Sequence, residues 1–276
     1  MVQSEAGMKN ILKIILITIL MSSTVRCLAE ESMIPEINLG VTIIQTCKGE
    51  KELNRATGFF FRYKDKKFLV TNRHVVTSAD KNYIPDYINI LLHANRSDLK
   101  SNRVVRVNLH EEGNPIWMDH PRYSDIKCDV VLIPLNHETM DKVNYYLFNT
   151  SSIEFFNEAQ LNIPEIHSFA NVVVVGYPLG FYDSINNLPV YRKAMIASAY
   201  PVKFMNKPYF LIDSNLHPGT SGSPVVNSHH TLFKEGKDKE GYKLFGIHSA
   251  EHTMRGEPLG LNVVWYSSLL AEIAEQ

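Results

Sequence analysis

The chain contains 276 residues, of which 45% are hydrophobic and 21% are charged. This composition supplies enough apolar surface for a folded core, which excludes disorder as a description of the whole chain. A formal net charge of -1 gives no overall basic field, so the charge balance indicates neither a nucleic-acid partner nor an anionic membrane surface.

A short apolar segment near the N-terminus has the layout of a secretory signal peptide. Lys9 and Lys13 come before an apolar run over residues 14–21, and a polar segment with small residues follows. The alternative is a membrane anchor, but the run is shorter than the roughly 20 apolar residues that a span requires. We therefore predict a signal peptide over residues 1–29, a secreted or periplasmic location, and no stable membrane insertion after signal removal.

The rest of the chain predicts an all-β fold. Short runs of β-branched and aromatic residues alternate with turn residues, which is typical of a sandwich or barrel, and no strand–helix–strand alternation indicates a doubly wound sheet. Residues 266–274 predict one closing helix. The predicted strands are VTIIQT, TGFFFRY, KFLVT, YINILL, RVVRV, DVVLIPL, NVVVV, YFLI, PVV and LNVVW.

A polar stretch from Asn149 to Glu165 separates two strand-rich halves of similar length. We place a domain boundary there, which gives an N-terminal domain over residues 30–150 and a C-terminal domain over residues 151–276. The charged segment 234–243 mixes both signs and predicts a solvated hairpin tip.

Two cysteines remain after removal of the predicted signal peptide. Cys47 and Cys128 would pair in an oxidising compartment if the fold brings them together. The alternative is that both are small buried hydrophobic side chains. The sequence leaves the two interpretations open.

The segment HPGTSGSPVV carries the strongest chemical signal. Ser221 has a glycine on each side within two residues, and Gly219 allows the backbone to turn sharply and direct N–H groups into one small space. Such a turn can stabilise the oxyanion of acyl transfer, although a Gly/Ser-rich β-turn is the ordinary alternative. A hydrolase elbow needs glycine where this chain has Ser223, and a helix where it predicts a strand.

A serine nucleophile in a loop between strands can have its base and acid earlier in the chain, in the order His, Asp, Ser. His74 in KFLVTNRHVV follows an apolar strand and is the candidate base, although most histidines have no such role. Asp129 in KCDVVLIPL opens an apolar run, where a buried carboxylate needs a donor such as an imidazole N–H. Its alternative is a carboxylate bonded to a turn, and Asp125 is the competing acid.

Taken in order, the segments ATGFFF, KFLVTNRHVV, DVVLIPL, NVVVVGYPLG, HPGTSGSPVV and LFGIHSA resemble the landmark segments of trypsin-like serine peptidases of the chymotrypsin fold. The nearest branch is the bacterial one that includes the glutamyl endopeptidases and the HtrA protease domain. The resemblance covers about residues 40–270. It implies two packed six-stranded antiparallel β-barrels, with the active site between them and a C-terminal helix.

The resemblance also implies roles for individual residues. Ser221 corresponds to the nucleophile, His74 to the general base and then acid, and Asp129 to the carboxylate that orients His74. The backbone N–H groups of Gly219 and Ser221 correspond to the oxyanion hole. Thr220 stands where many animal members have an aspartate, so activation by pairing of a new amino terminus with that aspartate is not expected.

Two residues bear on the substrate pocket. His248 in LFGIHSAEH lies, by the resemblance, on the strand that lines the pocket for the residue before the scissile bond, where a histidine in relatives recognises Glu or Gln. Leu216 stands where those relatives usually have a hydroxyl residue, which favours small or apolar substrate residues instead. Both preferences remain open at this point.

We therefore predict an exported serine endopeptidase that acts on protein or peptide substrates through an acyl-enzyme intermediate. No metal or organic cofactor is expected, because His229 and His230 have no further ligand at zinc-site spacing, and no nucleic-acid partner is expected. One alternative is a catalytically silent binding module with the same fold, and another is an esterase that uses a later histidine. Ser221→Ala and His74→Ala distinguish these three hypotheses.

Overall fold

Residues Ile37–Gln276 form one compact unit composed mainly of β-strands. The predicted signal peptide lies outside the described residues, and so does most of the charged segment that was expected to form a hairpin tip. In the part of the chain that the structure describes, no helix has the length and apolar character needed to cross a membrane. The computed structural model describes residues 35–78, 82–161, 168–227 and 242–276.

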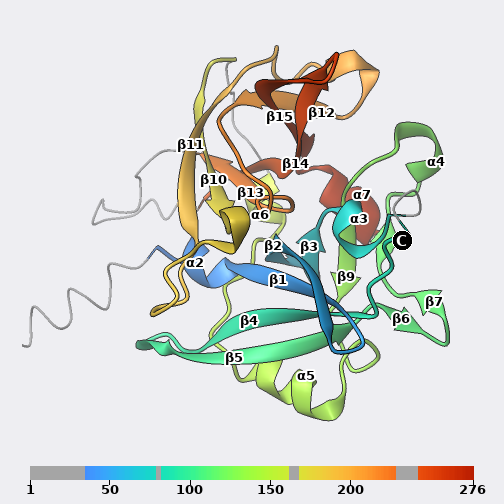
Figure 1. Cartoon of the computed structure of the whole chain (residues 1–276), viewed down its shortest axis with the longest axis vertical. Helices are drawn as coiled ribbons and strands as arrows, with labels where there is room; N and C mark the ends of the chain where they lie inside the picture. Colours follow the sequence, from blue (N-terminus) through green and yellow to red (C-terminus); the bar gives the residue numbers. More distant parts are fainter. Residues whose placement is uncertain (1–34, 79–81, 162–167, 228–241) are drawn as a thin grey trace, which may run out of the picture. The chain divides into compact units, whose positions relative to one another are not determined.

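The first sheet contains seven strands, and every neighbouring pair is antiparallel. Its strand β2 is buried at six successive residues, from Ala56 to Phe61, so both of its faces pack against other parts of the fold. Aromatic and β-branched residues suit such a strand. The spatial order is β5 (Asp98–Asn108), β4 (Tyr87–Asn95), β1 (Val41–Lys48), β2 (Lys51–Tyr63), β3 (Lys66–Thr71), β9 (Val131–Pro134) and β8 (Met118–Asp119) (Figure 1).

The second sheet closes on itself as a six-stranded antiparallel barrel. Closure leaves no unpaired edge, because the first and last strands of the order below are hydrogen-bonded to each other. The order is β10 (Asn171–Gly176), β11 (Val190–Ile196), β12 (Tyr209–Asp213), β15 (Glu257–Tyr266), β14 (Leu244–Met254) and β13 (Pro224–Asn227) (Figure 1).

The helices are short. Only α5 and α7 exceed four residues in the described ranges, and α7 ends the chain. The helices are α2 (Ile37–Gly40), α3 (Arg73–Val76), α4 (Tyr123–Ile126), α5 (Lys142–Asn149), α6 (Glu158–Leu161) and α7 (Leu269–Ala274), with 3₁₀ turns η2 (Pro178–Gly180) and η3 (Phe204–Asn206) and a small ribbon of β6 (His110–Glu111) and β7 (Asn114–Pro115).

One hydrophobic cluster joins the two sheets. It contains Phe59 and Val70 of the first sheet, Leu211 and Trp265 of the barrel, and Ile273 of α7. Two further clusters lie within the first sheet and within the barrel. The shared cluster fixes the two sheets against each other, which allows side chains from both to form one site.

The all-β prediction and the closing helix are confirmed. The barrel has the expected six strands, whereas the first sheet has seven, and its edge strands β5 and β8 are not paired with each other among the described residues. Strand β11 and helix α5 were not predicted. The domain division stays a prediction, and the polar stretch proposed as its boundary lies between β9 and β10. Both Cys47 and Cys128 are buried free thiols.

Candidate active site

His74 and Asp129 are in direct contact. Helix α3 places His74 just after β3, and Asp129 lies just before β9, the strand paired with β3. The backbone N–H of His74 donates to Asp129 Oδ1 at 2.9 Å, and His74 Nδ1 lies 2.7 Å from Asp129 Oδ2. Because an ionised carboxylate only accepts, Nδ1 carries the proton and Nε2 is free to accept one. The His74 side chain is 43% exposed, so Nε2 is accessible to a reacting group.

Further contacts hold Asp129 in place. The Ser249 hydroxyl donates to Asp129 Oδ2 at 2.6 Å, and the Asn72 side-chain amide donates to the Asp129 carbonyl at 2.7 Å. Sequence reasoning did not find Ser249, although it directly follows the candidate pocket residue His248. No local pattern could reveal this contact, because Ser249 lies on β14 of the barrel and Asp129 belongs to the first sheet.

Ser221 lies in the loop between β12 and β13. The two glycines around it, Gly219 and Gly222, have φ angles of +95° and +85°, which side-chain-bearing residues rarely adopt. A Cβ on Gly222 would lie 2.1 Å from the Thr57 carbonyl oxygen, so only glycine permits this approach of the loop to β2. The turn is further closed by the Gly222 N–H, which donates to the His248 carbonyl at 2.9 Å.

Two N–H groups of this turn point away from internal acceptors. Among the hydrogen bonds of the described residues, none uses the N–H of Gly219 or of Ser221. The carbonyl of Pro218 accepts from the Leu179 N–H at 2.6 Å, and the carbonyl of Thr220 accepts from the Ser223 N–H at 3.0 Å. Since C=O and N–H point in opposite directions across a trans peptide, these contacts orient the Gly219 and Ser221 N–H groups. Both are available to an oxyanion.

Ser221 joins the histidine–carboxylate pair through an intermediate residue. Its hydroxyl donates to the Ser249 carbonyl at 3.0 Å, while the Ser249 hydroxyl binds Asp129. Within the described residues no hydrogen bond joins Ser221 to His74. The Ser221 hydroxyl is thus bonded to the Ser249 carbonyl and not to His74, and catalytic hydrogen bonds often form only when substrate is bound.

The two predicted pocket residues are both buried. His248 lies on β14 with Nδ1 3.0 Å from the Thr220 carbonyl and Nε2 3.3 Å from Asn262 Oδ1. Burial lowers the pKa of His248 below its ordinary value. The Asn262 amide donates to the Ser214 carbonyl at 2.6 Å, which fixes Oδ1 toward the imidazole. Leu216 packs in the hydrophobic cluster of the barrel.

The described residues contain no group of three or more His, Cys, Asp or Glu side chains placed to hold a metal ion. An imidazole oriented by a carboxylate, a serine hydroxyl and two backbone N–H groups without internal partners are the kinds of group that acyl transfer uses.

The antiparallel barrel, the first sheet packed against it and the closing helix define the class: this is a serine peptidase of the chymotrypsin fold, a hydrolase. A family model described as the trypsin-like peptidase domain matches residues 56–233, more than half of the chain. The chain belongs to this family. No curated protein matches it.

Solved structures with a similar fold include HtrA-type proteases. A serine endoprotease from Yersinia pestis has a TM-score of 0.51 and 14% sequence identity, over 89% of this chain and 65% of that one. AlgW, an HtrA-type protease solved with a tripeptide, has a TM-score of 0.50 and 14% identity, over 86% of this chain and 60% of that one. The chain spans less than two thirds of both proteins, and at such identity the likeness concerns the fold alone.

Proposed function

We propose that the protein is an exported serine endopeptidase with Ser221 as nucleophile, His74 as general base and acid, and Asp129 as the orienting carboxylate. The observation that carries the proposal is the two-point contact between His74 and Asp129, at 2.7 Å and 2.9 Å. This contact fixes both the tautomer and the direction of the imidazole. The link from Asp129 through Ser249 to the Ser221 hydroxyl also supports it.

The reaction follows from these positions. Rotation of the Ser221 hydroxyl away from the Ser249 carbonyl lets it donate to His74 Nε2, which takes the proton as Oγ attacks the peptide carbonyl carbon. The negative charge that develops on the carbonyl oxygen is stabilised by the N–H groups of Gly219 and Ser221. His74 then protonates the leaving amine, and water hydrolyses the acyl-enzyme by the same steps in reverse order.

Labelling with a fluorophosphonate tests the proposal, because this reagent modifies only an activated serine. We expect one adduct per molecule, located on Ser221 by peptide mass spectrometry. Ser221→Ala and His74→Ala remove it, since one lacks the nucleophile and the other lacks the base. Ser124→Ala and His252→Ala are matched controls at residues without a role in the site and keep full labelling. A folded wild-type chain that takes up no reagent contradicts the proposal and favours a catalytically silent binding module.

We further propose that the enzyme prefers Glu or Gln before the scissile bond, with His248 as the recognising residue. Its Nδ1 lies 3.0 Å from the Thr220 carbonyl of the nucleophile turn, which supports a place beside the reacting bond. In the structure Asn262 Oδ1 is the hydrogen-bond partner of His248 Nε2, so a substrate oxygen has to replace this amide oxygen. Both are hydrogen-bond acceptors, so the exchange requires a neutral His248 with its proton on Nε2, facing the substrate oxygen.

A set of fluorogenic peptides that differ only at this position tests the preference. We expect kcat/KM for Glu and Gln to exceed that for Ala and Leu by about tenfold or more, the size of one buried hydrogen bond to a polar group. His248→Ala should remove the difference. A preference for Ala or Leu in the wild-type chain would instead support selection by an apolar pocket.

Export is proposed from the N-terminal segment. Production of the whole chain in a secreting host, followed by N-terminal sequencing of the protein outside the cytoplasm, should give Glu30 as the first residue. Retention of the full-length chain in the cytoplasm contradicts export.

A further inference from the structure

We propose that the Thr57 side chain is a positioning residue that holds the oxyanion turn in its active arrangement; this inference rests on the proposed function. Thr57 is fully buried on β2 of the first sheet. Its hydroxyl donates to the Gly219 carbonyl at 2.8 Å and accepts from the Tyr177 N–H at 3.1 Å. A single hydroxyl thus connects three segments that are far apart in the sequence.

The backbone of Thr57 strengthens the same connection. Its N–H donates to the Ser221 carbonyl at 2.9 Å, and its carbonyl accepts from the Thr71 hydroxyl at 2.9 Å. Thr57 therefore holds the carbonyls of Gly219 and Ser221, which flank Thr220. The peptide between these two carbonyls carries the Ser221 N–H. The peptide that precedes the Gly219 carbonyl carries the Gly219 N–H, so both N–H groups proposed for the oxyanion belong to peptides next to those that Thr57 holds.

The second partner of the hydroxyl, Tyr177, begins the turn that orients the Gly219 N–H. This turn contains Leu179, whose N–H holds the Pro218 carbonyl at 2.6 Å. It also packs tightly on the nucleophile loop, because a Cβ on Gly219 would lie 2.5 Å from the Tyr177 carbonyl oxygen. Thr57 thus binds the Gly219 carbonyl as well as the turn that orients the Gly219 N–H.

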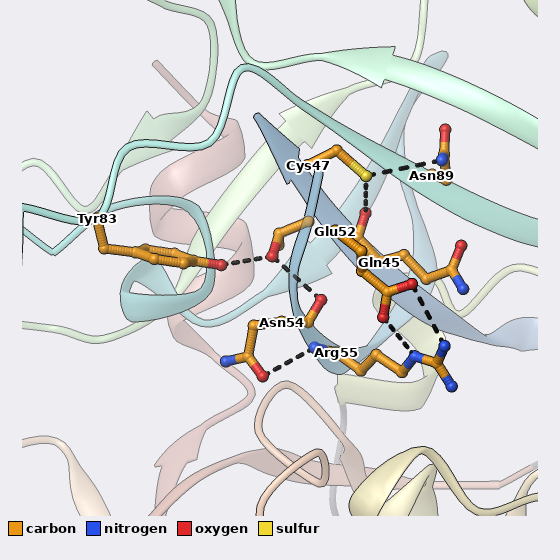
Figure 2. Close-up of polar contacts among 8 residues, drawn as sticks. Gln45, Cys47, Glu52, Asn54, Arg55, Tyr83 and Asn89 are labelled. Atoms are coloured by element: carbon orange, nitrogen blue, oxygen red, sulfur yellow. Dashed lines mark hydrogen bonds and ion pairs between the residues drawn. The ribbon is translucent and has the colours of Figure 1, made fainter. Parts of the chain in front are cut away.

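The strand segment before Thr57 makes local side-chain contacts and touches the same turn. Figure 2 shows Arg55 with its guanidinium on the Glu52 carboxylate and its backbone N–H on the Asn54 side chain, at 2.6 Å and 2.8 Å. A Cβ on Gly180 would lie 2.9 Å from Arg55 Cδ, so the turn that begins at Tyr177 also rests on this side chain. Residues 55 and 57 of β2 therefore both fix the turn.

Loss of the hydroxyl would leave two buried backbone groups without partners, the Gly219 carbonyl and the Tyr177 N–H. Such groups are costly to bury unpaired, and the chain relieves the cost where the backbone is most free to rotate. Gly219 has that freedom. Rotation of its peptides moves an oxyanion donor, so the effect falls on the transition state and not on substrate binding.

Two pairs of variants isolate the hydroxyl. Thr57→Val keeps the shape and removes the hydroxyl, while Thr57→Ser and Thr57→Ala both lack the methyl group and differ only in the hydroxyl. We expect kcat to fall about tenfold or more in the Val and Ala variants, less than the 10² to 10³ for outright loss of a donor, with KM changed by less than about twofold. The Ser variant should retain most of the activity. Affinity for a peptide aldehyde, which forms an oxyanion on Ser221, should fall in parallel with kcat.

Thr42→Val is the matched control for loss of a buried threonine hydroxyl. Thr42 is fully buried on β1, and its hydroxyl likewise donates to a carbonyl and accepts an N–H, both from Leu91. This variant should lose stability comparably while keeping kcat. If Thr57→Val does not fold, the comparison of kcat between Thr57→Ser and Thr57→Ala tests the inference.

The inference is wrong if Thr57→Val or Thr57→Ala keeps the wild-type kcat, if Thr57→Ser loses as much as Thr57→Ala, or if Thr42→Val loses as much as Thr57→Val. Failure of the proposed function has a different signature, because the wild-type chain then shows neither turnover nor labelling of Ser221. In that case both inferences are overturned together.

Discussion

Asp129 accepts hydrogen bonds from the His74 backbone, the His74 imidazole and the Ser249 hydroxyl. These donors occupy both carboxylate oxygens and leave little freedom for the side chain to rotate. The orientation of the His74 imidazole is fixed as well, because its Nδ1 is bonded to one of these held oxygens. Ser249 acts through Asp129 and is therefore a positioning residue.

Replacement of the carboxylate tests this arrangement. In Asp129→Asn, an amide N–H can face His74 Nδ1 and stabilise the tautomer that carries its proton on Nε2, which cannot accept another. We expect kcat to fall by about 10⁴, with little change in fold. Ser249→Ala keeps both His74 contacts and should cost about tenfold at most. Steady-state kinetics across pH 5 to 9 measures both, and a variant Asp129→Asn within tenfold of wild type contradicts the assigned role.

Buried histidines set a pH dependence of stability. Burial lowers the pKa of His93 and of His248 in the folded chain. The unfolded chain therefore binds more protons as pH falls through about 6.5, the ordinary histidine pKa, and the free energy of unfolding decreases below that pH. The loss grows as the pH falls further below this value, for as long as the buried histidines stay neutral.

Urea denaturation between pH 7.5 and 5.5 measures this dependence. His93→Gln removes one of the titrating groups, so its free energy of unfolding should fall less with acidification than that of the wild type. His137→Gln, at an exposed position, should follow the wild-type profile. An unchanged pH profile in His93→Gln would contradict the linkage.

At the level of elements, the loop between β12 and β13 depends on close backbone contact with β2. Gly222 and Gly256 both have φ angles of +85°, but only Gly222 has neighbours where a Cβ would lie. The two positions therefore separate backbone strain from steric exclusion. The difference in stability loss between alanine substitutions at Gly222 and at Gly256 measures how tightly the nucleophile loop fits the first sheet.

Gly256→Ala should cost about 1 kcal/mol, because alanine is strained at positive φ but meets open space. Gly222→Ala adds a contact of 2.1 Å with the Thr57 carbonyl, so the loop must shift. We expect several further kcal/mol of destabilisation, typical of overpacking, and loss of fluorophosphonate labelling. Thermal unfolding and labelling check both variants, and similar behaviour of the two would contradict a tight fit.

The sequence predicts elements well where hydrophobic residues are continuous, and poorly elsewhere. Strand β11 was missed because Arg192 and Lys193 interrupt the apolar run, and only the closed barrel completes the pairing of the strand. Helix α5 was missed because it is short and mostly exposed. Its signal was the N-cap Asp141, whose side chain accepts from the Asn144 N–H at 2.8 Å.

The same distinction applies to the candidate site. His74, Asp129 and Ser221 stand in recognisable local segments, so pattern and order were sufficient to propose them as a triad. Ser249 and Thr57 act through contacts with residues more than a hundred positions away. Such contacts depend on how the two sheets pack, which no local segment encodes.

At the scale of the whole molecule, the C-terminal helix α7 stabilises the packing of the two sheets against each other. Ile273 of α7 is fully buried in the cluster shared by both sheets. Polar contacts add to this packing, because the Tyr63 hydroxyl donates to Glu275 at 2.6 Å and His120 Nε2 lies 3.1 Å from the Glu272 carboxylate. The helix thus contributes to the arrangement on which the active site depends.

Ile273→Ala should lower the free energy of unfolding by about 2 to 5 kcal/mol, through lost burial and a residual cavity. Val143→Ala truncates a comparable side chain that is 66% exposed, and should change stability by less than about 0.5 kcal/mol. Urea denaturation gives both values. A loss at Ile273 no greater than that at Val143 would falsify the structural role of the helix.

Cys128 directly precedes Asp129 in the chain and is a buried free thiol. Burial raises its pKa to about 12, so the nucleophilic thiolate is almost absent at neutral pH while the chain is folded. Alkylation at this position consequently requires the surrounding structure to open first. The rate at which Cys128 is alkylated therefore reports how often the structure around the proposed catalytic carboxylate opens.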